Sequence, residues 1–403
     1  MNVLFLTLVS FDSLQVKMLY SDLLREFVRH GHDVYVISPC ERRENIPTHV
    51  IQEDRATILR LRIGNTQKTN LIEKGISTLL IERQFTAGIK QYFRDVKFDL
   101  VLYSTPPITL VSAIDFVKKR DQAKTYLLLK DIFPQNAVDL GMLTTTGPKG
   151  LIYKHFRRKE KKLYRISDRI GAMSQANVDY VIQHNPEVDP KIVEVCPNSI
   201  EVVDKSVDAE TRNSIRAKYG IPLDKKVFVY GGNLGKPQGI PFLIECLRKC
   251  EDIEEAYFLI VGDGTEYGLL ENYVDGEKPR NVRLMQRLPK DDYDVMVGAC
   301  DVGLLFLDHR FTIPNFPSRL LSYMQAKLPV FAVTDPNTDV GKVITDGGFG
   351  WWCESNDSVE FKRIIDMIIA SNKCKDNDSI LRYLQNHYNS SQSYEIICGR
   401  YEE

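Results

Sequence analysis

Short apolar runs that alternate with helix-length segments dominate the chain and limit the folds it can adopt. In the first half, the runs that we expect to form strands are Val3–Val9, Asp33–Ser38, Phe98–Tyr103, Lys124–Ile132, Arg169–Met173 and Ile192–Val195. They are continuously apolar and rich in Val, Ile and Leu, which is typical of parallel strands covered by helices on both faces. The pattern predicts an α/β, doubly wound fold.

The second half repeats this pattern after Pro197, Asn198 and a polar linker, Glu201–Thr211. Its expected strands are Val227–Tyr230, Ala256–Val261, Val282–Leu288, Val302–Leu307 and Pro329–Val333. A chain of 403 residues is also too long for one ordinary core. We predict a first domain over residues 1–200, a second over 201–376, and C-terminal helices over 377–403, for which packing back onto the first domain is one arrangement.

The composition excludes several classes of protein. With 43% hydrophobic and 27% charged residues and a net charge of −1, the chain lacks the basic excess that wholesale binding of nucleic acid needs. We see no signal peptide and no apolar run near the roughly 20 residues of a membrane span. Its eight cysteines form no CxxC pair, so we expect reduced core residues of a cytoplasmic protein and no metal framework.

A candidate anion site lies in the segment Phe311–Val333, which reads as loop, helix and strand. Pro314 and Pro317 exclude an earlier helix, so we expect the helix to begin at Ser318 with its hydroxyl as the N-cap. Free N–H groups at a helix start and the planar fork of Arg319 suit phosphate oxygens. We predict a nucleotide diphosphate here. The alternative is an ordinary connection with a capping Ser and a surface Arg.

Two glycine-rich loops follow expected strands of the second half. The first, Gly231–Gly239, is no Walker loop, because Pro237 stands where the magnesium-binding Ser or Thr belongs, but Lys236 is a candidate cation for a pyrophosphate. The second, Gly262–Gly268, has one residue too many for the dinucleotide G-x-G-x-x-G spacing, which disfavours NAD. The alternative for each loop is a tight turn without a ligand.

Taken in order, the blocks DIFPQNAVDLGML, SDRIGAMS, CPNSIE, YGGNLGKPQG, VGDG, ACDVGLLFL and PSRLLSYMQAKLPV resemble the family 4 glycosyltransferases of bacterial capsule and O-antigen synthesis. The likeness covers nearly the whole chain. It implies the GT-B fold, with two Rossmann-like, doubly wound domains facing a central cleft. It also implies a nucleotide sugar in the C-terminal domain, an acceptor in the N-terminal domain, transfer with retention, and no metal or other cofactor.

The resemblance also implies roles for single residues. Lys236 and Arg319 would stabilise the leaving diphosphate, and Asp131 would lie near the sugar or the acceptor hydroxyl, although a turn or N-cap carboxylate is the alternative. Arg287 and Leu288 match the region that meets the base, and His309 and Arg310 are weaker candidates. The residues that we assign to donor binding are Gly231, Gly232, Asn233, Gly235, Gln238, Gly262, Asp263, Arg287, Leu288, Pro317, Ser318 and Ser322.

The chain also departs from the family pattern. Ser322 replaces the glutamate that holds the ribose, and Asn233 and Gln238 replace the usual Arg and Lys, for which Lys236 looks like the compensating cation. The glycine pair that commonly follows the first strand is absent, because the sequence there is LVSFDSLQ. That loop therefore suits a different acceptor.

A basic segment, Tyr153–Arg165, contains seven Lys and Arg against the single Glu160. Apolar residues at helical spacing are Ile152, Phe156, Leu163 and Ile166, which predicts a cationic opposite face. We assign to the membrane or acceptor side Lys154, Arg157, Arg158, Lys161 and Lys162. A solvated helix face is the alternative; the resembled branch, which uses polyprenyl-diphosphate-linked acceptors, favours peripheral contact with the inner face of the cytoplasmic membrane.

These observations lead to one main hypothesis and two rivals. The main hypothesis is a retaining hexosyl- or N-acetylhexosaminyltransferase that moves a sugar from a UDP-linked donor to a lipid-linked saccharide of capsule or O-antigen. The rivals are a nucleotide-sugar epimerase and a non-catalytic protein that binds nucleotide sugars.

Overall fold

The computed structural model describes residues 1–65, 71–371 and 377–399. The chain forms two compact units, one made of Met1–Glu201 with Ser390–Glu403 and one of Val202–Asn389. Our expected boundary after residue 200 lies one residue before this division. The expected C-terminal segment 377–403 is divided between the units at Ser390.

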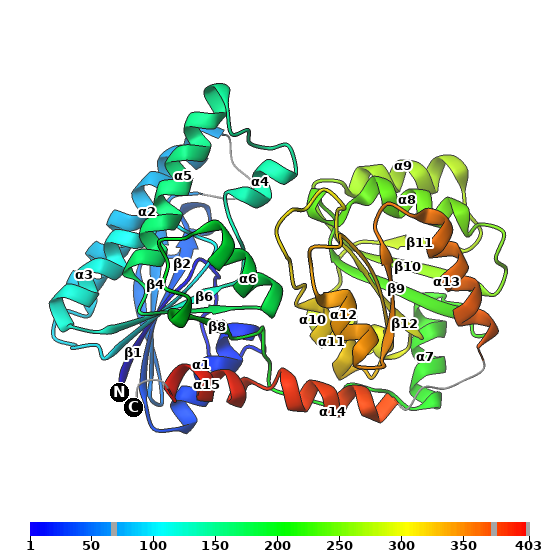
Figure 1. Ribbon diagram of the computed structural model, residues 1–403. Helices are drawn as coiled ribbons and strands as arrows, with labels where there is room; N and C mark the ends of the chain where they lie inside the picture. Colours follow the sequence, from blue (N-terminus) through cyan, green and yellow to red (C-terminus); the bar gives the residue numbers. More distant parts are fainter. Residues whose placement is uncertain (66–70, 372–376, 400–403) are drawn as a thin grey trace. The chain divides into compact units, whose positions relative to one another are not determined.

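The first unit is built on an eight-stranded sheet of order β3-β4-β2-β1-β5-β6-β7-β8 (Figure 1). All neighbouring strands are parallel except β3, which is antiparallel to β4. The strands are β1 Asn2–Leu6, β2 Asp33–Glu41, β3 His49–Glu53, β4 Ala56–Ile63, β5 Leu100–Ser104, β6 Lys124–Leu129, β7 Arg169–Ala172 and β8 Val193–Val195.

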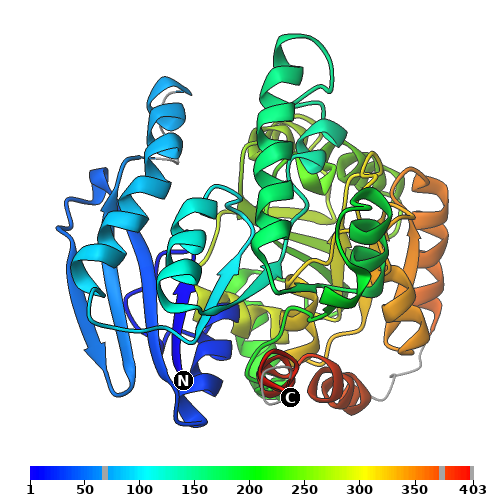
Figure 2. The same cartoon turned by 60° about the vertical axis from the view of Figure 1, so that its left-hand side comes forward.

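Helices cover both faces of this sheet. They are α1 Leu19–Arg29, α2 Leu71–Tyr92, α3 Val111–Asp121, α4 Gln135–Asp139, α5 Gly147–Ile166, α6 Gln175–His184 and α15 Ser390–Cys398. Ile58 of β4 packs into one core with α1 and α15, whereas its neighbour Leu59 faces Gly88 of α2. Helix α3 lies between α2 and α5 (Figure 2). The doubly wound arrangement that the sequence predicts is confirmed.

The second unit has a six-stranded sheet of order β11-β10-β9-β12-β13-β14, all parallel. Its strands are β9 Lys226–Asn233, β10 Ala256–Asp263, β11 Val282–Met285, β12 Val302–Phe306, β13 Val330–Thr334 and β14 Gly350–Glu354. This is the 3-2-1-4-5-6 order of Rossmann sheets, in which the chain reverses direction between the first and fourth strands. The switch point therefore lies between β9 and β12, where ligands of such sheets bind.

The helices of the second unit also lie on both faces. They are α7 Ala209–Tyr219, α8 Ile240–Lys249, α9 Tyr267–Glu277, α10 Lys290–Gly298, α11 Arg319–Gln325, α12 Val340–Asp346, α13 Ser358–Ala370 and α14 Asn377–His387. Leu304 of β12 belongs to the core that packs α8, α9 and α13, whereas the adjacent Gly303 faces Tyr323 of α11. Short 3-10 turns lie at Arg42–Glu44, Pro190–Ile192 and Lys236–Gln238.

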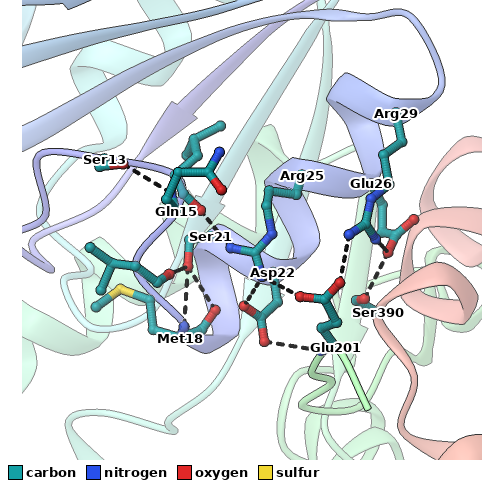
Figure 3. Close-up of polar contacts among 12 residues, drawn as sticks. Ser13, Gln15, Met18, Ser21, Asp22, Arg25, Glu26, Arg29, Glu201 and Ser390 are labelled. Atoms are coloured by element: carbon teal, nitrogen blue, oxygen red, sulfur yellow. Dashed lines mark hydrogen bonds and ion pairs between the residues drawn. The ribbon is translucent and has the colours of Figure 1, made fainter. Parts of the chain in front are cut away.

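Helix α1 binds both points at which the chain leaves and re-enters the first unit (Figure 3). Arg25 and Arg29 form ion pairs with the Glu201 carboxylate at 2.9 and 2.6 Å. The Ser390 hydroxyl donates to Glu26 at 3.0 Å, and the Ser390 N–H donates to the Ile200 carbonyl at 3.0 Å. The two crossing points are thus hydrogen-bonded to each other and to one helix.

Two further expectations concern the whole chain. Within the described ranges, none of the helices combines the length and apolarity that crossing a bilayer requires. Seven cysteines are buried free thiols, and the eighth, Cys374, lies outside the described residues.

Candidate functional site

Two glycines, Gly231 and Gly232, lie near the end of strand β9, just before its last residue. A Cβ on Gly231 would lie 1.7 Å from the Tyr293 hydroxyl oxygen. Gly232 has a φ of +119° and a Cβ there would lie 3.1 Å from Nη2 of Arg319. At the end of β10, a Cβ on Gly262 would lie 2.0 Å from the Gly232 carbonyl oxygen. The glycines therefore let neighbouring groups approach the backbone closely, and the Arg319 guanidinium lies beside Gly232 at the switch point.

Arg319 begins α11 and directs its guanidinium over the ring of Tyr230, 4.3 Å from the ring centroid. Its Nη1 is enclosed by protein and has no hydrogen-bond partner in the part of the chain that the structure describes. Burial acts to lower the pKa of Arg319, but Tyr230, Tyr323 and Tyr293 raise it, and the net pKa lies above its ordinary value. Arg319 is thus a cation with an unused buried donor beside a glycine backbone.

Tyr323 fixes α11 against the strands that carry this site. Its single hydroxyl hydrogen is shared between the carbonyl oxygens of Val229 and Leu304 at 3.2 and 3.1 Å, and the hydroxyl oxygen accepts from the Gly231 N–H at 3.2 Å. These bonds join α11 to β9 and β12 one turn after Arg319. The guanidinium is therefore held in place before any ligand binds. Ser322, the residue at the position of the ribose-binding glutamate, precedes Tyr323 and is half-buried.

Ser318 does not have the role that we predicted. It is exposed, its φ and ψ of −64° and −18° are already helical, and its side chain makes no capping hydrogen bond. A capping residue needs extended dihedrals to turn its hydroxyl back onto the first turn. The predicted N-cap is therefore wrong, and the helix begins at Arg319 after a half-buried Pro317.

The loop after β9 is held by its own side chains. Gln238 Oε1 accepts from Asn233 Nδ2 at 2.8 Å and from the Gly235 N–H at 3.2 Å. The two residues that replace the family's cations thus bind each other and shape the loop. Lys236 is exposed. Burial raises the pKa of the neighbouring Glu266, and Lys236 partly offsets this rise.

The remaining donor candidates line the same edge of the second sheet. Asp263 ends β10, and its Oδ1 lies 4.0 Å from Nη1 of Arg287, which follows β11; both side chains are exposed. Leu288 is half-buried just before α10. Arg310 forms a 2.7 Å ion pair with Asp308, and His309 lies 3.8 Å from the same carboxylate.

Asp131 lies at the carboxyl edge of the first sheet, two residues after β6. Both of its carboxylate oxygens accept from Asn136 Nδ2 at 2.8 Å, and Thr105 Oγ1 donates to its carbonyl at 3.1 Å. Burial raises the pKa of Asp131 from 3.8 to about 6, although hydrogen bonds from Ile132 and Asn136 lower it. Asp131 can therefore exchange a proton near neutral pH, and it does not cap α4, whose N-cap is Pro134.

Sequence reasoning missed Asn136. Its carboxamide is the side-chain partner of Asp131, and its Oδ1 is buried without a hydrogen-bond partner in the described residues. Asp131 and Asn136 both lie in the block DIFPQN, five positions apart. Because they are separated by a proline turn and not by a helical spacing, the pattern alone did not pair them.

The basic residues of α5 divide into two groups. Arg157 binds Glu160 at 2.6 Å and Asn185 at 2.7 Å, and Lys161 pairs with Glu187 at 2.9 Å. Both cations thus neutralise acids of their own unit, and their assignment to the membrane or acceptor side stays a prediction. Lys149 at the start of α5 is exposed, and so are four cations further along the helix, Lys154, Arg158, Lys162 and Arg165. We call these four residues the free basic face.

The apolar stripe of α5 is only partly buried. Leu163 is buried and Phe156 and Ile166 are half-buried, as expected of a helix packed on its unit. Ile152 is 48% exposed and its neighbour Leu151 is 71% exposed, although both are large apolar residues. These two side chains extend from the same helix as the free basic face. Elsewhere, no group of three or more His, Cys, Asp or Glu in the described ranges is arranged to hold a metal ion.

Two family models match the chain, one after the other. The model described as "Glycosyltransferase Family 4" matches residues 18–203, and the model described as "Glycosyl transferases group 1" matches residues 211–383. The first match covers most of the unit that carries Asp131 and ends two residues beyond Glu201. The second contains the β9 loop, Arg319 and Ser322.

Individual proteins show the same likeness. The probable glycosyltransferase WbjE of Pseudomonas aeruginosa is 25% identical over 76% of this chain and 74% of its own. The putative colanic acid biosynthesis glycosyl transferase WcaI of Escherichia coli K12 is 26% identical over 51% of this chain and 49% of its own. Among solved structures, HepE of Anabaena in complex with UDP has a TM-score of 0.67 at 15% identity and covers 100% of both chains, which shows a shared fold.

Proposed function

This chain belongs to the family 4 glycosyltransferases and has their GT-B fold, and from that premise we propose that it moves a sugar from a UDP-linked donor to a lipid-linked saccharide. Transfer proceeds with retention at the anomeric carbon. The donor binds the second unit and the acceptor the first. The sugar is a hexose or an N-acetylhexosamine. The UDP-bound HepE structure supports the choice of nucleotide.

The observation that carries this proposal is the buried, unpaired Nη1 of Arg319 at the switch point. A diphosphate leaving group gains negative charge as the glycosidic bond breaks, so a fixed donor that meets it stabilises the transition state. Arg319 holds the diphosphate from the start of binding. Lys236, which is exposed on a short turn, completes the neutralisation during bond breaking. With two cations for the diphosphate, the proposed transfer needs no metal ion and no other cofactor.

Asp131 has the properties of a group that acts on an acceptor hydroxyl. A carboxyl group with a pKa of about 6 is partly ionised near neutral pH and can accept a proton. Asn136 holds the carboxylate in one orientation. In the proposed reaction Asp131 orients the attacking hydroxyl, and Asn136 positions Asp131.

We also propose that the protein works at the inner face of the cytoplasmic membrane. The free basic face of α5 suits anionic headgroups, at roughly 1 kcal/mol for each nearby cation. The exposed Leu151 and Ile152 suit the apolar boundary beneath the headgroups. The resemblance to the capsule and O-antigen branch, and the name of WcaI, support an acceptor of cell-surface polysaccharide synthesis.

The test is a transfer assay with a panel of UDP-sugars and a short polyprenyl-diphosphate-linked acceptor, in buffer with excess EDTA. We expect one donor to be consumed and the proton spectrum of the product to show the anomeric configuration of that donor. An inverted product would contradict the retaining mechanism. Epimer formation without acceptor would identify an epimerase, and tight UDP-sugar binding without turnover on any acceptor would identify a binding protein. Loss of activity in EDTA would refute the metal-free mechanism.

A further inference from the structure

Arg60 is a buried cation of the first unit that has no acidic partner. It lies on β4 and is only 5% exposed. Its Nη1 donates to the Ser10 hydroxyl at 3.0 Å, the Phe11 carbonyl at 2.9 Å and the Ser38 hydroxyl at 2.9 Å. All three acceptors are neutral. No carboxylate of the described residues forms an ion pair with Arg60, and its Nε and Nη2 donate to no atom of those residues.

Arg60 lies toward the carboxyl ends of the strands of the first sheet. Arg60 is in register with Ser38 of β2, and the preceding residue of β2, Ile37, pairs with Leu6, the last residue of β1. Arg60 therefore lies where the loop from β1 to α1 begins. Ligands of open α/β sheets bind outside these carboxyl ends.

The same contacts shape that loop. The Ser38 hydroxyl accepts from the Phe11 N–H at 2.8 Å and donates to the Val9 carbonyl at 3.3 Å. With the bonds from Arg60, these fold residues 9–11 over the guanidinium and leave Ser10 exposed. In related enzymes a glycine pair stands in this loop, and here it is replaced by LVSFDSLQ.

The charge balance of this arrangement is incomplete. Burying an ion costs several kcal/mol unless a counter-ion and hydrogen bonds compensate. Hydrogen bonds from one nitrogen, whose two hydrogens are shared among three neutral acceptors, compensate only in part. Nε and Nη2 are not among the fully enclosed polar atoms. These two nitrogens form one side of the planar guanidinium fork, which suits two phosphate oxygens.

We infer that Arg60 and Ser10 form a phosphate-binding site at the β1–α1 loop and that this site holds the diphosphate of the lipid-linked acceptor. The inference rests on the proposed function for the identity of the lipid. The phosphate site itself is inferred from the buried charge of Arg60, which has no acidic partner among the described residues. Nε and Nη2 of Arg60 bind two phosphate oxygens, while its Nη1 keeps the loop folded. The Ser10 hydroxyl donates to a third oxygen.

The test measures binding of farnesyl diphosphate by calorimetry to protein saturated with UDP, so that the donor site does not take up the probe. Arg60→Lys keeps the charge but removes the fork, and we expect it to weaken binding about tenfold, which corresponds to about 1.4 kcal/mol. Ser10→Ala removes only the exposed hydroxyl, and we expect about a threefold loss. Ser13→Ala, on the same loop, is the matched control and should bind like the parent.

Equal affinity in the parent, Arg60→Lys and Ser10→Ala would overturn the inference. If Arg60→Lys fails to fold, Ser10→Ala alone decides, because an exposed hydroxyl contributes little to the core. Farnesyl diphosphate should bind more tightly than inorganic pyrophosphate; equal binding of the two would overturn the assignment to a lipid. If Arg60-dependent binding persists while no lipid-linked acceptor receives a sugar, the proposed function fails and the phosphate site remains.

Discussion

Burial of the Asp131 carboxyl group has a consequence for stability that depends on pH. Its pKa is about 6 in the folded protein against 3.8 without burial. Above pH 6 the carboxylate is charged in both the folded and unfolded states, so the cost of burying the charge is fully present. Below about pH 4 it is protonated in both states and the cost is absent. Asp131 therefore destabilises the fold progressively as the pH rises from 4 to 6.

We predict that Asp131→Asn raises the melting temperature at pH 7.5 by roughly 2 to 4 °C, the shift that about 1 kcal/mol gives in a unit of this size. The gain should shrink as the pH falls and disappear near pH 4. Thermal unfolding at pH 7.5, 6 and 4.5 measures this directly. The exposed Asp12→Asn serves as control and should leave the melting temperature unchanged. A gain of the same size at every pH would show that burial of the Asp131 charge is not its cause.

Single residues show which parts of the candidate site could be proposed from the sequence and which could not. The glycines, Lys236 and Arg319 were assigned to the donor site because glycine and cations near strand ends have a chemical meaning in any sequence, and the structure places Arg319 beside Gly232. The surroundings of Arg319 were not found, because Tyr230, Tyr293 and Tyr323 read as ordinary apolar positions of strands and helices. The bond between Asn233 and Gln238 was also missed, since both residues were interpreted only as replacements of cations.

Among the elements, the expected strands of both sheets exist, but β3, β4 and β14 were missed. Strand β14 is short, lies at the edge of the second sheet and is mostly half-buried. Strand β4 carries Arg60 and Arg62, which interrupt the apolar run that identifies a parallel strand. Strand β3 lies at the edge of the sheet and its residues are mostly exposed or half-buried, so it lacks that run altogether. Charged and exposed residues weaken the hydrophobic pattern from which strands are predicted, so these strands could not be recognised in the sequence.

Helix α5 provides a prediction about contact with the membrane. Replacing Lys154, Arg158, Lys162 and Arg165 with Gln removes the free basic face but keeps good helix formers. We expect sedimentation with phosphatidylglycerol vesicles to fall at least tenfold, because each exposed cation near the surface contributes roughly 1 kcal/mol. The melting temperature should stay close to that of the parent.

The matched control is Arg157→Gln with Lys161→Gln on the same helix. These cations pair with Glu160 and Glu187, so vesicle binding should be retained. The melting temperature should fall, because Glu160 is 3% exposed and would lose its cationic partner. If the control loses vesicle binding as strongly as the fourfold variant, α5 does not contact lipid through its free basic face.

At the scale of the whole molecule, the two-unit division was accessible to sequence because a polar linker interrupts the pattern. The sequence did not reveal that the C-terminal segment is divided between the two units at Ser390. Tyr394 of α15 stacks on His30 with ring centroids 4.0 Å apart, and its hydroxyl lies 2.8 Å from Nε2 of His32. Contacts between residues this far apart leave no trace in a local pattern.

The second unit has its own core and contains every donor residue that we assign. We therefore predict that the fragment 202–389 folds alone and binds UDP within about threefold of the affinity of the full chain, a difference of about 0.7 kcal/mol. Circular dichroism establishes whether the fragment unfolds cooperatively, and calorimetry gives the affinity. A folded fragment with no affinity for UDP would mean that the donor site needs residues of the first unit.

The central claim is that Arg319 holds the diphosphate of the donor. The most direct measurement is a calorimetric comparison of UDP and uridine binding to the parent and to Arg319→Ala, with Arg363→Ala as a control that removes an exposed arginine of the same unit already paired with Glu360. A hydrogen bond to a charged group contributes about 1.5–3 kcal/mol, so we predict that Arg319→Ala weakens UDP binding roughly 10- to 150-fold and leaves uridine binding unchanged. Equal affinity for UDP in the parent and in a correctly folded Arg319→Ala would contradict the account.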